Sequence, residues 1–181
     1  WAATARVWSV CRAHAGNCIF TLAGHSHAVC VAMMSTTDQF VTGAQDKTLR
    51  FWTNGQLTKT IPEAHSDIIR CISPLVSTTP LLPMSAVPPA IASASNDMTI
   101  KLWTADGAPL MTLSGHQSFV FHVTQVTSDT RLIASASDDM TVKIWDITTG
   151  QVVQNLLHAA TVWQVRHLAT GDLVSACKDG V

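Results

Sequence analysis

Three nearly identical seven-residue phrases recur along this chain, and each of them ends in tryptophan. They are DKTLRFW ending at Trp52, DMTIKLW ending at Trp103 and DMTVKIW ending at Trp145, and a degraded copy, AATARVW, ends at Trp8. Successive tryptophans are 44, 51 and 42 residues apart. A repeat of this length implies that the chain folds as a series of similar units rather than around one core built from the whole sequence.

The copies contain short runs of Val, Ile, Thr, Phe and Trp that alternate with polar residues, and they show little helical periodicity. In the clearest copy the pattern predicts strands at 119–126, 132–136, 141–146 and 152–156. Tight-turn pairs join the third and fourth strands at Asn54-Gly55, Asp106-Gly107 and Thr149-Gly150. Four strands per copy predict an all-β chain of small antiparallel sheets, with the period of a propeller blade.

Other residues repeat in step with the tryptophans. Each copy has a histidine at its start, an aspartate six residues before the tryptophan and a small hydroxyl four residues before that aspartate: His25, Thr42, Asp46 and Trp52; His65, Ser93, Asp97 and Trp103; His116, Ser135, Asp139 and Trp145. We expect a buried relay in which aspartate accepts from histidine, histidine bonds to the hydroxyl, and the hydroxyl accepts from the indole N–H. A hydrolase triad is unique and lies in an open cleft, so repetition favours a structural role over catalysis.

The Gly-His, S/T-x-x-x-D and D-x-T-x-x-x-W phrases together resemble the WD-repeat β-propeller family, and they cover essentially the whole chain. The Trp-Asp pair itself remains only at Trp145-Asp146, since threonine follows Trp52 and Trp103. The copies predict three complete four-stranded blades, 23–61, 62–113 and 114–156, plus a half blade at each end, 1–22 and 157–181. The resemblance implies a fragment of a seven-bladed ring. The alternative is a four-bladed ring closed by pairing of the two half blades.

Composition argues against several function classes. Lys and Arg total 11, Asp and Glu total 12, and the formal net charge of −1 provides no footprint for nucleic acid or a membrane surface. The cysteines lack a CxxC pair and are interpreted as reduced core or pore-lining thiols: Cys11, Cys18, Cys30, Cys71 and Cys177. Histidines such as those of His25-Ser26-His27 lack metal-ligand spacing, so we expect no metal and no cofactor.

A proline-rich run, LVSTTPLLPMSAVPPA at 75–90, separates the first and second strands of the second complete copy. Proline lacks the backbone N–H that a strand ladder needs, so we expect a loop here. Its apolar residues are compatible with a docking segment, and the run is equally compatible with a tolerated surface insertion.

Function is expected where the copies differ. The family resemblance places the binding face at the rim, at positions three and five residues after each histidine and one residue before each aspartate: Ala28, Cys30, Gln45, Ile68, Arg70, Asn96, Phe119, Phe121, Asp138, Thr161, Trp163 and Lys178. Phe119, Phe121, Trp163 and Arg70 are of the residue types that dominate binding hot spots. The alternative interpretation is that some of these aromatic residues simply pack between blades.

The order of the copies, from TARVW to VWQVRHLATGDLVSACKDG, resembles the later blades of the phospholipase A2-activating protein family. That resemblance implies a cytoplasmic and nuclear, non-catalytic scaffold that binds ubiquitin in ubiquitin-dependent protein turnover and serves a AAA segregase through regions outside this sequence. An apolar patch of ubiquitin would dock on the rim aromatics, while Arg70, Asp138 and Lys178 set its register. The alternatives are a structural WD-repeat subunit of another assembly and an enzyme, which would need an unrepeated acid, base or nucleophile.

Overall fold

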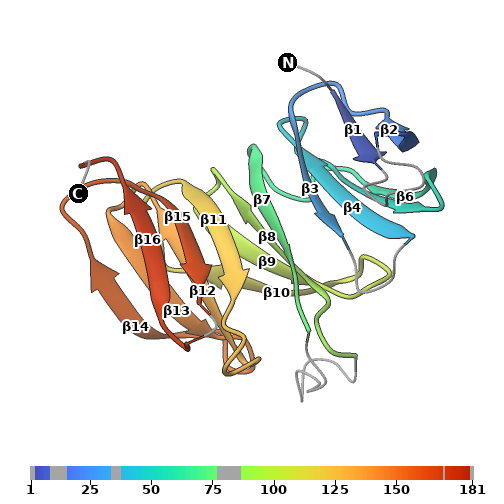
Figure 1. Ribbon diagram of the computed structural model, residues 1–181. Coiled ribbons are helices and arrows are strands. Elements are labelled where there is room, and N and C mark those ends of the chain that lie inside the picture. Colours follow the sequence, from blue (N-terminus) through green and yellow to red (C-terminus); the bar gives the residue numbers. More distant parts are fainter. Residues whose placement is uncertain (1–2, 9–15, 34–37, 77–86, 169, 180–181) are drawn as a thin grey trace.

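The computed structural model describes residues 3–8, 16–33, 38–76, 87–168 and 170–179 (Figure 1). Three four-stranded antiparallel sheets follow one another along the chain, with a two-stranded sheet at each end. The all-β prediction of three complete blades and two half blades is therefore confirmed. The predicted strands of the clearest copy agree with the observed ones to within one residue at each end.

The strands within each complete blade are ordered as they occur in the sequence. The opening half blade has β1 (Thr4–Trp8) and β2 (Cys18–Ala23); the first blade has β3 (Val29–Met33), β4 (Gln39–Ala44), β5 (Leu49–Thr53) and β6 (Gln56–Ile61); the second has β7 (Ile69–Pro74), β8 (Ile91–Ser95), β9 (Thr99–Trp103) and β10 (Pro109–Ser114). The third blade has β11 (Val120–Gln125), β12 (Leu132–Ser137), β13 (Thr141–Asp146) and β14 (Gln151–Leu157), and the closing half blade has β15 (Val162–His167) and β16 (Leu173–Cys177).

The blades are arranged as an arc in which the first strands, β3, β7, β11 and β15, are neighbours along the inner side (Figure 1). The two half blades remain separate sheets, with β1 paired to β2 and β15 paired to β16. Among the described residues no strand pair joins them, and the two half blades lie at opposite ends of the arc (Figure 1). The alternative of a four-bladed ring closed by these half blades is therefore wrong for this structure.

Each hydrophobic core is shared by two neighbouring sheets. Leu102 and Leu113 of the second blade pack with Ile133 and Trp145 of the third, and Phe51 of the first blade packs with Trp103 of the second. The second strand of a blade is covered on both faces, which explains why β8 (IASAS) is buried at every position and consists largely of small residues. The repeated tryptophans thus occupy cores between blades.

The proline-rich segment interrupts the second blade where the sequence places it. β7 ends at Pro74 and β8 begins at Ile91, and the base of the loop is closed by a bond from the Leu75 N–H to the Ala90 carbonyl oxygen at 2.8 Å. The prediction of a docking segment rests mainly on 77–86, which lie outside the described residues.

The described cysteines are Cys18, Cys30, Cys71 and Cys177, and all four are free thiols. Cys30 and Cys71 lie on inner strands, where burial raises the pKa of the Cys30 thiol to about 12 and that of Cys71 in the same direction. Cys18 is exposed, so the prediction of a core or pore position is wrong for this residue, because the outer strand β2 has one face open to solvent. Cys11 lies outside the described residues.

Candidate functional site

The polar residues that recur with the tryptophans are in contact in all three complete blades. In the third blade, His116 Nδ1 lies 2.7 Å from Asp139 Oδ2, His116 Nε2 lies 2.7 Å from Ser135 Oγ, and Trp145 Nε1 donates to Ser135 Oγ at 2.8 Å. The other two blades repeat these contacts at 2.7–2.9 Å through His25, Asp46, Thr42 and Trp52, and through His65, Asp97, Ser93 and Trp103.

Burial fixes the protonation state of this relay. Burial lowers the pKa of His25 and His116 even though a carboxylate faces each ring. A neutral imidazole then donates from Nδ1 to the aspartate and accepts at Nε2 from the hydroxyl. Burial opposes ionisation of Asp97, but hydrogen bonds from His65 and Thr99 more than offset it and hold the pKa of this carboxyl well below its usual range.

The relay also ties two loops of each blade together. Asp139 accepts from the backbone N–H groups of Gln117, which follows the histidine, and Thr141, which begins the third strand, at 2.9 and 3.1 Å. The loop that enters a blade is therefore held against the turn between its second and third strands. These two loops form the rim, so the buried relay sets the position of the exposed rim residues.

The closing half blade departs from this arrangement. His158 Nε2 lies 2.9 Å from Ser175 Oγ, and His158 Nδ1 lies 3.2 Å from the carbonyl oxygen of Leu156. A backbone acceptor thus faces the ring nitrogen that a carboxylate faces in the complete blades.

A backbone hydrogen bond in every copy brings the variable rim positions together. The N–H of the residue before the aspartate position donates to the carbonyl oxygen three residues after the histidine: Gln45 to Ala28, Asn96 to Ile68, Asp138 to Phe119 and Lys178 to Thr161, at 2.9–3.1 Å. All four copies therefore present these residues at the same end of the blades.

Four of these residues form a continuous group, which we call the rim cluster: Arg70, Phe119, Phe121 and Trp163. The rings of Phe121 and Trp163 are stacked with centroids 4.6 Å apart, and Phe119 meets Phe121 edge-on at 6.4 Å. The guanidinium carbon of Arg70 lies 5.8 Å from the centroid of the Phe121 ring. The strand of Phe121, β11, lies between β7, which contains Arg70, and β15, which contains Trp163. Trp163 is 49% exposed and Phe119 39% exposed.

Two of the remaining predicted rim residues, Asn96 and Asp138, hold neighbouring rim residues in place. Asn96 accepts from Arg70 Nε at 2.8 Å, which orients the guanidinium. Asp138 accepts from Ser118 Oγ at 3.1 Å and from Thr161 Oγ1 at 2.8 Å, so it links the third blade to the closing half blade. Lys178 is exposed, while Ala28, Cys30 and Gln45 of the first blade line a shallow cavity of about 120 Å³ beside Arg70 and away from the aromatic rings.

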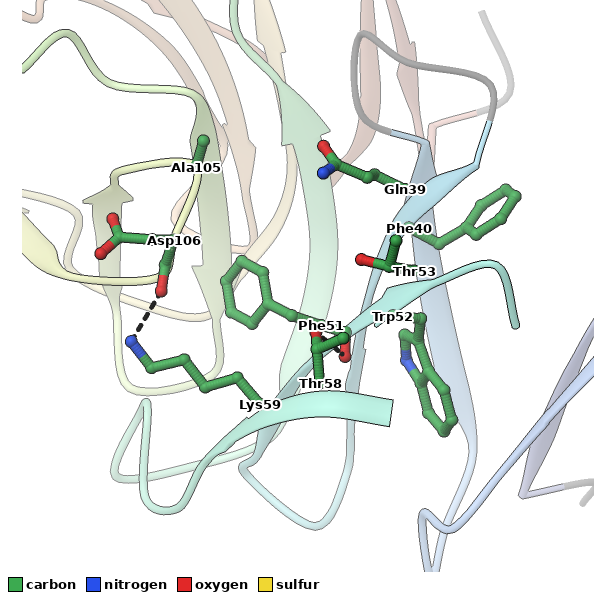
Figure 2. Close-up of a pocket in the computed structure, with 9 residues that line it drawn as sticks. All are labelled: Gln39, Phe40, Phe51, Trp52, Thr53, Thr58, Lys59, Ala105 and Asp106. Carbon is green, nitrogen blue, oxygen red and sulfur yellow. Dashed lines mark hydrogen bonds between the residues drawn. The ribbon is translucent and has the colours of Figure 1, made fainter. Parts of the chain in front are cut away.

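A different cavity, of about 430 Å³, lies between the first and second blades at the end opposite the rim. Figure 2 shows Phe51 and Trp52 on its wall and Lys59 extended toward Asp106, whose carbonyl oxygen accepts from Lys59 Nζ at 2.6 Å. Both aromatic rings belong to cores between blades, so this cavity is part of the seam between two blades.

Neither a metal site nor a membrane-spanning helix emerges from the part of the chain that the structure describes. Within these residues no three His, Cys, Asp or Glu side chains are grouped so that they could hold a metal ion. The described residues also include no helix that is long and apolar enough to cross a bilayer.

Two groups of residues were not anticipated from the sequence. Met98 and Met140 are exposed beside the rim at φ of 67° and 62°, at the position that Lys47 occupies in the first blade. His122, Gln164 and Arg166 line the inner side of the arc. A charged residue within the strand VWQVRH was the signal that could have indicated the second group.

Comparison with known proteins identifies the repeat. The model of the WD40 family, described as "WD domain, G-beta repeat", matches residues 16–53, 55–104 and 107–146. The crystal structure of the WD40 β-propeller domain of Doa1 superposes with a TM-score of 0.81 at 27% identity, covering 98% of this chain and 55% of that one.

Two curated relatives bear different names. The ubiquitin homeostasis protein lub1 of Schizosaccharomyces pombe is 37% identical over 200 residues, which are 89% of this chain and 26% of the relative. The nuclear distribution protein PAC1-2 of Uncinocarpus reesii is 34% identical over 131 residues, 65% of this chain and 28% of the relative. The chain thus spans about a quarter of the length of these relatives.

Proposed function

Because this chain belongs to the WD40 repeat family, we propose that it is a non-catalytic module that binds another protein through its rim cluster. The polar groups that would suggest catalysis are the repeated, buried relay residues, each already bonded to its neighbours within a blade.

The observation that carries the proposal is the stack of Arg70, Phe121 and Trp163. These residues come from β7, β11 and β15, so the stack crosses two blades and the closing half blade. It places a large aromatic surface and a cation on the rim, where Trp163 and Phe119 are partly exposed. Aromatic residues and arginine in such a cluster provide most of the binding energy at protein interfaces.

We propose ubiquitin as the ligand, in ubiquitin-dependent protein turnover and in service of a AAA segregase. The support is the 37% identical relative, which is named as a ubiquitin homeostasis protein. An apolar patch of ubiquitin would pack on Phe119, Phe121 and Trp163. Arg70, Asn96, Asp138 and Lys178 surround this surface and would set the orientation of the partner.

The test is a titration of isotope-labelled ubiquitin with wild-type protein and variants, followed by NMR. Trp163→Ala, alone and combined with Phe121→Ala, is expected to weaken binding at least about tenfold, since truncation of a hot-spot residue costs roughly 2 kcal/mol or more.

The matched control is Trp8→Ala, because Trp8 is 50% exposed, like Trp163, and belongs to the opening half blade. This control should bind ubiquitin as the wild type does. If Trp163→Ala keeps its circular dichroism spectrum and its affinity, the rim cluster is not the binding surface.

A second candidate function is that of a WD-repeat subunit in an assembly unrelated to ubiquitin. The relatives named as nuclear distribution proteins favour it, at 30–34% identity over about two thirds of this chain. Two results together would favour this function over the first. The wild-type protein would cause no chemical-shift changes in labelled ubiquitin, and the Trp163→Ala variant would fail to bind another partner that the wild type binds.

A further inference from the structure

The inner side of the arc contains a pocket of about 460 Å³ that shares Arg70 with the rim cluster but is lined by none of the three aromatic residues of that cluster. Its walls come from all four inner strands, with Cys30 on β3, Arg70 to Pro74 on β7, His122 on β11 and Arg166 on β15. These strands are neighbours along the arc (Figure 1), so the pocket is a property of the assembled blades and of no single copy.

The lining of this inner pocket is cationic. It includes Arg70 and Arg166 but no aspartate or glutamate. Arg70 donates to the neutral amide of Asn96, and Arg166 donates from Nε and Nη2, at 3.2 and 2.9 Å, to the Gln164 side-chain oxygen when that amide faces it. Neither charge is neutralised by an acid of the pocket wall, and a concave surface with unbalanced positive charge attracts anions.

His122 also lines the inner pocket. The side chain is 8% exposed, and its Nδ1 atom, which has no hydrogen-bond partner among the described residues, is covered by protein atoms. Burial and the nearby Arg166 lower the pKa of His122 to about 4, so the ring is neutral near pH 7 and leaves the arginines as the cations.

The shape and the remaining lining limit the ligand further. Pro74 is an exposed apolar residue of the lining, and Ser73 supplies a hydroxyl. Its volume exceeds what a free oxyanion would fill. The fork of an arginine side chain matches the oxygens of phosphate better than a point charge does.

We propose that the inner pocket binds a phosphate monoester, with Arg166 as the principal ligand of the phosphate, Arg70 beside it, and the organic group against Pro74. The monoester belongs either to a small molecule or to a phosphorylated side chain of a docked protein. The site lies beyond the proposed binding of ubiquitin and does not depend on it.

The experiment is calorimetric titration of the protein with two probes, phenyl phosphate and N-acetyl-phosphoserine amide, in about 0.15 M salt to screen long-range attraction. Both probes are expected to bind, and the tighter of the two identifies the source of the monoester. Arg166→Gln should weaken binding about tenfold or more, the loss expected for a charge-assisted hydrogen bond.

The matched control is Arg131→Gln, which removes the same charge from an exposed arginine paired with Asp129. It should leave the affinity for both probes unchanged. Absence of binding by both probes, or an equal loss in Arg166→Gln and Arg131→Gln, would overturn the proposal. Neither probe contains ubiquitin, so the outcome of the probe titrations does not depend on whether the protein binds ubiquitin.

Discussion

At the scale of single residues, the hydroxyl of Ser135 shows how each blade satisfies its buried polar atoms. A serine hydroxyl has one proton to donate and two lone pairs. Ser135 uses the proton toward His116 Nε2 and a lone pair for the Trp145 indole, at 2.7 and 2.8 Å. Asp139 in turn fixes the tautomer of His116 by accepting at Nδ1. Each member of the network satisfies the hydrogen bonds of the next, so removal of one member leaves its neighbours without a partner.

Asp139→Ala tests the relay. It leaves His116 Nδ1–H and the N–H groups of Gln117 and Thr141 without their acceptor. We expect the free energy of unfolding to fall by about 1.5–3 kcal/mol, the range for loss of a bond to a charged group in a buried site. Urea unfolding followed by tryptophan fluorescence measures it. Asp129→Ala is the control, since Asp129 pairs with the exposed Arg131, and the change should be clearly smaller. Equal effects would contradict a relay that stabilises the blade.

At the scale of strands and turns, the blades contact one another through the turns between third and fourth strands. Gly107 has a φ of +76°, and a Cβ placed there would lie 2.7 Å from Phe51 and 2.9 Å from Ile61 of the preceding blade. Glycine is required for two reasons: any other residue would be strained at this φ, and its Cβ would have no space. The close approach of this turn to the outer strand of the preceding blade seals one core.

Gly107→Ala is therefore expected to destabilise the protein by more than backbone strain alone. Overpacking of a well-packed site costs about 1–3 kcal/mol in addition to the conformational penalty. Gly171→Ala separates the two effects, because Gly171 has a φ of +99° but nothing within 4 Å of its Cβ position. Thermal unfolding of both variants measures the difference. Similar losses of stability would show that packing between the blades contributes little at this turn.

At the scale of the whole molecule, stability is distributed along the arc. Each core joins two neighbouring sheets, so it depends on interfaces between adjacent blades as well as on each blade itself. Three buried histidines of the first and third blades share one electrostatic property. Burial lowers the pKa of His25, His116 and His122, the last to about 4. Acidification therefore acts on two blades at once.

The pH dependence of stability follows from these shifts. In the unfolded chain these histidines become protonated near pH 6.5, whereas in the folded protein they stay neutral to a lower pH. The free energy of unfolding should therefore be highest above pH 6.5 and fall as the pH drops from there toward 4. Below about pH 4 the relay aspartates add to the loss, since their folded pKa values lie below the unfolded ones. Urea unfolding at several pH values tests this. His122→Leu should lose less stability between pH 6.5 and 4 than the wild type. A flat profile, or one that rises on acidification, would contradict the shifts.

The repeat in the sequence determined the strands, the number of blades and the residues that contact one another inside each blade. Ser135, Asp139 and Trp145 recur at fixed spacings, and a histidine such as His116 precedes them at the start of each copy, because the same four-stranded sheet needs the same buried partners. Local pattern was sufficient for this, since strand alternation and turn residues are encoded within about 40 residues. The rim positions could be named for the same reason.

Only the tertiary structure decided how different copies meet. Phe121 and Trp163 lie in separate copies, and their stacking at 4.6 Å depends on the angle and offset between β11 and β15. The inner pocket likewise arises from four strands, and Arg166, Gln164 and His122 occupy positions that no repeated phrase marks. Spacing along a chain fixes contacts within a repeating unit, whereas contacts between units depend on how complete sheets pack against each other. The sequence by itself therefore determined the blades, and the packing of the blades decided the surfaces that can bind.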